Sequence, residues 1–243
     1  MKKSKRTQPR SIASIPLKSF RNTWANACNT MWVEITAISH LETYLRGQYP
    51  FIANNAELSD VIYAPTCVSY RGTRRINRVG NTKNDILKDI TKYLNYPVIL
   101  RVVLLSAAFE SYFLEFLDRY LENRPKYFNG GKRTAAGNKI HDDVKKARGP
   151  VNRIAKFKEL TNAKINSITP HLDALSDVYM IRNVMAHSAG ICTVQDVESF
   201  KTISPIANEV IHISVQHLVD KLAKPCLEIA NSLDGKIIPG DIT

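Results

Sequence analysis

The sequence predicts an all-α protein, and three observations support this prediction. Residues 98–122 are apolar on nearly every side of a helix, which is typical of a central core helix. Thr169-Pro170 and Ser204-Pro205 each place an N-cap residue before a proline at the first helical position, so each predicts a helix start. No strands alternate with helices along the chain, as they would in an α/β protein.

Residues 1–80 are expected to form a basic N-terminal extension. Apolar residues recur at three- and four-residue steps over residues 20–46, which predicts one helix with an apolar face. Gly47 and Pro50 end this pattern. Residues 48–80 have no helical period, so the sequence predicts either a long ordered loop or a small hairpin there.

Residues 81–243 are expected to form the main helical domain. Its helices are predicted over residues 84–95, 98–122, 138–147, 151–163, 170–187 and 205–233. Pro97 is expected to end the first of these and Pro225 to kink the last. Gly190 lies where the C-terminal cap of helix 170–187 is expected, and residues 191–197 then form a short connection.

The charge balance points to a polyanionic partner. Lys and Arg total 34 and Asp and Glu total 22, which gives a net charge of +12 and a pI near 9.6. Such a surplus attracts polyanions, and nucleic acid is the partner class that fits best. Solubility, or binding to an acidic protein, would explain the same charge.

The chain offers no metal or cofactor motif. The four cysteines, Cys28, Cys67, Cys192 and Cys226, form no C-x-x-C pair and are expected to be reduced thiols. The basic N-terminus is not followed by the apolar core of a signal peptide, and the longest apolar stretch contains Arg101. These features predict a cytoplasmic protein that does not enter a membrane and needs no cofactor.

An arginine cluster is interleaved with one aromatic residue in the N-terminal extension. Its members are Tyr70, Arg71, Arg74, Arg75 and Arg78. The guanidinium groups suit RNA phosphates, and Tyr70 suits stacking on a base. A solvated basic loop is equally consistent with these residues.

The end of helix 170–187 gathers groups that can act on a phosphodiester. Asn183 and His187 are four residues apart and share one face, and the long side chain of Arg182 can reach back towards them. A histidine can move protons near neutral pH, and an arginine can hold a phosphate through a bidentate fork. Such a set suits metal-free attack by a ribose 2′-hydroxyl, which requires RNA. On spacing alone, a histidine that caps the helix C-terminus is the simpler interpretation.

Glu110 is a carboxylate within the most apolar helix of the chain, so it needs a partner. Arg182 and Asn183 are candidates for that partner. Alternatively, Glu110 lies on a polar edge of the helix beside Arg101 or Lys126.

Two segments carry a family resemblance. Ile181-Arg-Asn-Val-Met-Ala-His-Ser-Ala-Gly190 resembles the signature of HEPN domains, an Arg followed by a polar residue, three further residues and a His. Leu105-Ser-Ala-Ala-Phe-Glu-Ser-Tyr112 resembles the earlier core helix of that family, whose acidic residue often faces the motif. More narrowly, the chain is similar to bacterial HEPN proteins of the RiboL-PSP and MAE_28990 types over residues 84–234.

The resemblance implies a HEPN-type helical bundle that forms a homodimer, with two copies of the motif in a cleft at the interface. It implies a metal-independent endoribonuclease of a bacterial toxin–antitoxin or antiviral defence system. Arg182, Asn183 and His187 would be catalytic, with Glu110 supporting them. Its partners would be RNA, a second copy of the chain and an antitoxin or sensor protein.

Two other functions remain open at this stage. Some HEPN proteins are non-catalytic modules that bind RNA, a nucleotide or a partner protein. A purely structural helical adaptor for an acidic partner would also use the positive charge. In one subset of the family, a Tyr two residues after the His is modified by a nucleotidyltransferase; Ala189 occupies that position here, so this regulation is not expected.

Overall fold

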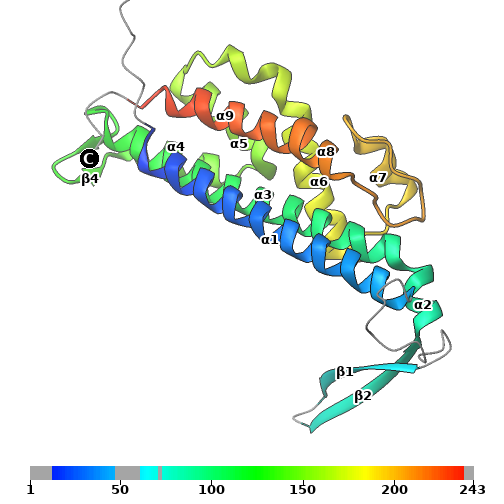
Figure 1. Ribbon diagram of the computed structural model, residues 1–243. Helices are drawn as coiled ribbons and strands as arrows, with labels where there is room; N and C mark the ends of the chain where they lie inside the picture. The colour runs from blue at the N-terminus through cyan, green and yellow to red at the C-terminus, as the bar shows by residue number, and fades with distance from the viewer. Residues whose placement is uncertain (1–12, 47–60, 71–72, 238–243) are drawn as a thin grey trace, which may run out of the picture. The chain divides into compact units, whose positions relative to one another are not determined.

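The computed structural model describes residues 13–46, 61–70 and 73–237, and it is mostly helical, as the sequence predicts (Figure 1). The chain divides into two units. Unit 1 comprises Met1–Ala27 and Arg101–Thr243, and unit 2 comprises Cys28–Leu100. The division at residue 80 that the sequence suggests stays a prediction.

The helices are, in chain order, α1 (Ile15–Leu45), α2 (Lys83–Lys88), α3 (Ile90–Glu122), α4 (Ala135–Lys146), α5 (Gly149–Thr161), α6 (Leu172–Ser188), α7 (Val194–Ser199), α8 (Val215–His217) and α9 (Lys224–Asp234). A 3₁₀ helix, η1 (Asn166–His171), precedes α6, and a π-helical segment, η2 (Leu218–Ala223), joins α8 to α9. Two antiparallel hairpins are formed by β1 (Val61–Tyr70) with β2 (Thr73–Thr82), and by β3 (Phe128–Asn129) with β4 (Lys132–Arg133).

One side of α3 packs against the first turns of α1 and against α9 within unit 1. The ring of Phe20 lies 6.0 Å from that of Phe109 and 5.6 Å from that of Tyr112. The Tyr112 hydroxyl donates a buried hydrogen bond of 2.6 Å to the carbonyl oxygen of Ala230 in α9. Since a buried phenol needs a partner, this bond fixes α9 against α3.

The opposite side of α3 packs against α5. The ring of Phe157 lies edge-on to Phe116 at 5.4 Å and to Tyr120 at 4.8 Å, in the geometry that aromatic pairs prefer. Phe113, Phe116 and Phe157 are almost fully buried. The core of unit 1 therefore surrounds α3, as its all-round apolar sequence predicts.

The expected end of a helix before Pro97 is wrong. α3 begins at Ile90 and continues through Pro97 to Glu122. A proline inside a helix costs about 3 kcal/mol, because it removes a hydrogen bond and crowds the preceding turn. Val98 and Ile99, which follow it, are 3% and 2% exposed. Burial of these side chains offsets the cost.

The expected helix start at Ser204-Pro205 is also wrong. Helix begins only at Val215, with the Ser214 side chain accepting from the His217 backbone N–H. The other Pro signature is displaced as well, since Pro170 lies within η1 and α6 begins two residues later. Pro225 lies in the first turn of α9, directly after the π-helical segment.

Two further segments differ from or refine the prediction. The connection expected over residues 191–197 contains the start of α7, which Thr193 and Asp196 cap reciprocally. Of the two alternatives for residues 48–80, the described part forms the hairpin β1–β2; residues 47–60 and 71–72 lie outside the described residues.

α3 is long and apolar enough to cross a membrane by length and composition, contrary to expectation, and it is the one such helix in the described part of the chain. However, 56% of its most apolar window is buried inside the structure. A core helix of a soluble protein has the same property, so this helix is weak support for a membrane span.

Gly137 provides a test of the packing around α4. A Cβ atom there would lie 2.2 Å from the carbonyl oxygen of Tyr127, a backbone atom that cannot easily move. Replacing an exposed helical Gly with Ala normally stabilises a helix by about 1 kcal/mol. We expect Gly137→Ala to destabilise the protein instead, by about 1–3 kcal/mol, because of this overlap. Denaturant unfolding would measure it, with the exposed neighbour Asn138→Ala as the control. An increase in stability for Gly137→Ala would contradict the described packing.

Candidate active site

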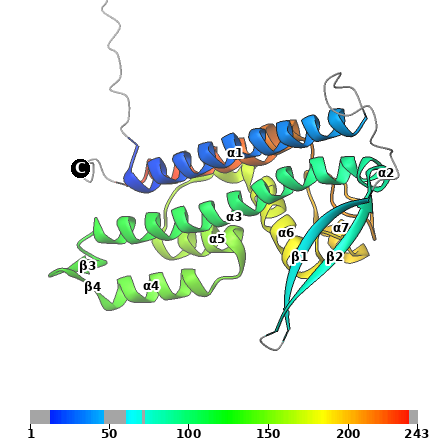
Figure 2. The ribbon, with the colours of Figure 1, turned by 60° about the horizontal axis from the view of Figure 1, so that its bottom comes forward.

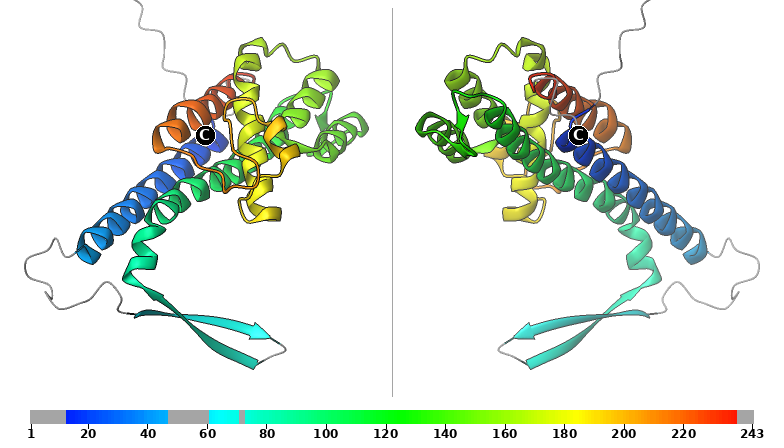
Figure 3. Two further views of the ribbon diagram at one scale, coloured as in Figure 1. Left: turned by 90° about the vertical axis from the view of Figure 1, so that its right-hand side faces the viewer. Right: turned by 90° about the vertical axis from the view of Figure 1, so that its left-hand side faces the viewer.

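The helix α6 presents the Arg-Asn-His motif on its more exposed side. Its buried side is formed by Ala174, Leu175, Asp177, Val178, Ile181 and Val184. Arg182 and Asn183 are half-buried, and His187 is exposed in the last turn. Figure 3 shows the final turns of α6 extending past α4 and α5. The predicted core positions Val178 and Ile181 are confirmed, whereas Met185 is only half-buried and Val184 takes its place.

Arg182 and Asn183 are joined by a hydrogen bond. The Arg182 Nη1 atom donates to the Asn183 Oδ1 atom over 3.3 Å. Within the described residues neither side chain is hydrogen-bonded to His187, which lies one helical turn beyond Asn183 on the same ridge. The guanidinium retains donors for an anion, because this one bond uses a single N–H group.

The chain turns sharply directly after the motif. Ala189 and Gly190 have φ angles of 49° and 89°, both in the left-handed region. Both backbone N–H groups donate to the Val184 carbonyl oxygen, and the Ile211 N–H donates to the Gly190 carbonyl oxygen over 2.9 Å. A Cβ atom at Gly190 would lie 2.9 Å from the Met185 sulfur. Gly190 is thus at the helix end, as expected, and fixes the end of α6 close to His187.

Glu110 has a partner that the sequence did not suggest. Its carboxylate oxygen lies 3.6 Å from Arg153 Nη1 of α5, and both side chains are largely buried. Arg101 instead donates to the Ala27 carbonyl oxygen, over 2.9 Å. The expected pairing of Glu110 with Arg182, Asn183, Arg101 or Lys126 is therefore not found among the described residues.

The arginine cluster lies on the hairpin β1–β2 of unit 2, except that Arg71 lies outside the described residues. Alternate positions of a strand belong to opposite faces, and cross-strand partners share a face. Arg74 and Arg78 therefore occupy one face, whereas Arg75 occupies the other. Tyr70 pairs with Thr73 and so shares the face of Arg75. The hairpin divides the cluster between its two faces.

Asp177 is a site residue that sequence reasoning missed. It is fully buried in α6, and its carboxylate accepts from the Lys201 backbone N–H at 2.9 Å and from the Thr202 N–H and Oγ1 at 2.5 and 2.6 Å. These bonds attach the segment after α7 to α6. The signal was an acidic residue in phase with the apolar positions Ala174 and Ile181.

His217 lies within the electrostatic range of Asp177. Its Nε2 atom is buried and has no hydrogen-bond partner among the described residues. Burial lowers the pKa of His217 below its usual 6.5, and the ammonium of Lys221 lowers it further, whereas the Asp177 carboxylate acts in the opposite direction. His217 is therefore a buried neutral imidazole, and it begins the π-helical segment.

The buried thiols do not suit nucleophilic chemistry. Burial raises the pKa of Cys192 to about 11 and that of Cys226 to about 12, so neither forms the reactive thiolate near neutral pH. Over the described ranges, no three or more His, Cys, Asp or Glu side chains are grouped to hold a metal ion.

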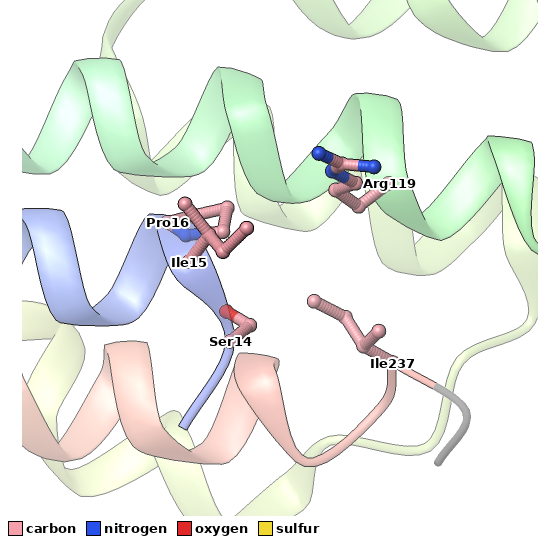
Figure 4. Close-up of a pocket in the computed structure, with 5 residues that line it drawn as sticks. All are labelled: Ser14, Ile15, Pro16, Arg119 and Ile237. Carbon is pink, nitrogen blue, oxygen red and sulfur yellow. The ribbon is translucent and has the colours of Figure 1, made fainter. Parts of the chain in front are cut away.

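A small recess lies away from the motif, where the start of α1 meets α3 and the residues after α9 (Figure 4). It is lined by Ser14, Ile15, Pro16, Arg119 and Ile237, and the side chains of Ser14 and Asp234 are hydrogen-bonded beside it. None of the predicted site residues lines this recess.

No family model, curated protein or solved structure matches the chain. The argument for a function therefore rests on the geometry and chemistry of the residues themselves.

His217 makes the stability of the protein depend on pH. Its pKa in the folded state lies below the unfolded value of 6.5, so the unfolded state takes up the proton first as pH falls. The stability contribution is present above pH 6.5 and is lost as pH falls through the folded pKa. We expect wild type to lose stability relative to His217→Leu between about pH 7.5 and about pH 5. Urea unfolding across this range would measure the difference. Stability profiles that stay parallel would contradict the burial of this imidazole, and the exposed His212→Leu serves as control.

Proposed function

We propose that this chain is a metal-independent endoribonuclease of the HEPN type, acting in a bacterial toxin–antitoxin or antiviral defence system. The observation that carries the proposal is the grouping on α6: Arg182 and Asn183 bonded to each other, with exposed His187 one turn further on. The net charge of +12 supports a polyanionic substrate. The mostly helical fold and the resemblance around residues 181–190 agree with this family.

The proposed reaction is attack of a ribose 2′-hydroxyl on the adjacent phosphorus. A neutral His187 imidazole takes the 2′-hydroxyl proton, and the 2′-oxygen forms the new bond to phosphorus. The bond from phosphorus to the 5′-oxygen breaks, and that oxygen takes a proton from a second imidazolium. Arg182 binds the non-bridging oxygens, where negative charge grows. The products are a 2′,3′-cyclic phosphate and a 5′-hydroxyl.

A second copy of the chain supplies the second imidazole in this proposal, as the partner's His187. Exposed apolar side chains follow the motif directly, and they are candidates for burial between two copies. They are Ile191, Val194, Ile206 and Val210, which are 44%, 61%, 63% and 42% exposed. Ile191 and Val210 are bridged by their backbones, so the two segments that carry these side chains lie together.

A non-catalytic HEPN module that binds RNA, a nucleotide or a protein is the second candidate. One observation favours it: Glu110, the expected supporting carboxylate, is paired with Arg153. His187 then has no described side chain to orient its imidazole, as many catalytic bases require. An antitoxin or sensor protein as partner stays a proposal, as does a cytoplasmic location.

The catalytic roles are tested by His187→Ala and Arg182→Ala. Removing the general acid–base should slow cleavage by about 10² to 10⁴. Loss of the guanidinium should cost about 10² to 10³. Both variants should stay folded, because neither side chain is buried. Cleavage of total RNA in EDTA, with analysis of the product ends, would measure this, and His212→Ala is the matched control. Undiminished cleavage by both variants would refute the catalytic assignment; RNA binding without any cleavage would favour the binding module.

The proposed dimer is tested by Val194→Asp combined with Ile206→Asp. Two buried carboxylates at an apolar interface are unfavourable, so we expect a dimer at micromolar concentration to become a monomer and to lose cleavage. Light scattering would measure the mass. Ile15→Asp, which is a similarly exposed apolar position on α1, should leave the mass unchanged. A wild-type monomer that cleaves RNA would contradict the composite site.

A further inference from the structure

We infer that the turn between α4 and α5 is a phosphate-binding surface that guides single-stranded RNA to the motif end of α6. The inference rests on the proposed function for the class of substrate. It assigns the binding surface to residues of unit 1 that lie outside the arginine cluster of the hairpin.

Positive charge is concentrated around this turn. Residues 124–164 contain twelve lysines and arginines but only three acidic residues, so nine of the twelve net charges of the chain lie in this segment. The segment covers β3, β4, α4 and α5. A field of one sign on neighbouring elements attracts a polyanion and increases its association rate.

Many of these cations have no acidic partner. Arg133, Arg153 and Lys156 are paired with Asp118, Glu110 and Glu159. No ion pair involves six exposed cations among the described residues. They are Lys132, Lys139, Lys145, Lys146, Arg148 and Lys164. Lys145 and Lys146 end α4 and Arg148 is the N-cap of α5, so three of the six lie within four consecutive positions.

This turn packs directly on the helix that carries the motif. Gly149, with a φ of +78°, follows Arg148, and a Cβ atom there would lie 3.1 Å from Cε1 of Tyr179 in α6. Tyr179 is four residues before Asn183 and eight before His187, so the rise along the helix from Tyr179 to His187 is ~12 Å. Figure 2 shows the end of α4 turning into α5 beside α6. RNA bound at the turn can therefore reach the motif within a few nucleotides.

Other uses of the three cations explain less. The dipole of α4 favours Lys145 and Lys146 in its last turn, but Arg148 lies beyond that helix and its charge repels theirs. Such repulsion is relieved when an anion binds. The hairpin fits a single RNA backbone less well, because Arg74 and Arg78 lie on the face opposite to Arg75.

The test is the affinity of a fluorescent single-stranded oligoribonucleotide for the full chain over a series of salt concentrations. We expect Lys145→Ala/Lys146→Ala/Arg148→Ala to bind roughly tenfold more weakly at physiological salt. The slope of log affinity against log salt should fall by about 2, since each lost phosphate contact contributes about 0.7. Circular dichroism would confirm the helical content of the variant. The matched control, Lys18→Ala/Lys221→Ala/Lys224→Ala, removes the same charge from exposed positions elsewhere and should retain the wild-type slope.

Three outcomes would overturn the inference. One is an equal loss in the control, which would mean that binding follows net charge alone. Another is wild-type binding by the turn variant together with weak binding by Arg74→Ala/Arg75→Ala/Arg78→Ala. The third is tighter binding of polyglutamate than of RNA at the same turn, which would indicate an acidic protein partner. If the turn variant loses RNA binding but wild type never cuts RNA, the binding surface stands and the proposed nuclease fails.

Discussion

The aromatic rings of α3 must be covered on more than one side, and this requirement organises unit 1. Phe109 and Tyr112 are covered by α1 and α9, whereas Phe116 and Tyr120 are covered by α5. α6 in turn contacts α5 and α9. The motif helix is therefore a second layer on an aromatic core, and its last turns are free to present polar groups because the core beneath is already closed.

Periodic apolar spacing predicted most helices of unit 1, because burial of one face is a local property of the sequence. It failed where distant contacts decide. Pro97 stays within α3 because its neighbours are buried, which a proline rule cannot take into account. The segment after Ser204-Pro205 stays extended because its backbone bonds to Gly190 and Cys192 instead of forming a helix. A local cap signature cannot reveal such partners.

The candidate site shows the same division. Arg182, Asn183 and His187 were identified from their spacing on one helix, and the structure places them at its exposed end. The partner of Glu110 was not identified, because it lies on α5 and depends on how two helices cross. The basic turn was overlooked because its charges are spread over four elements, whereas the arginines of the hairpin are close together in the sequence. Folding separates those arginines onto two faces.

The π-helical segment Leu218–Ala223 has a consequence for how the C-terminal part of the chain tolerates change in length. In it the Lys224 N–H donates to the Val219 carbonyl oxygen, five residues back, so one more residue is accommodated than in an α-helical turn. Deleting a single residue there would restore regular helix and rotate everything that follows by about 100°. Cys226, Ile229 and Leu233 are all completely buried, and this rotation would turn them out of the core. The register of α9 is thus set by one supernumerary residue, and a one-codon deletion in this segment would be far more damaging than most substitutions.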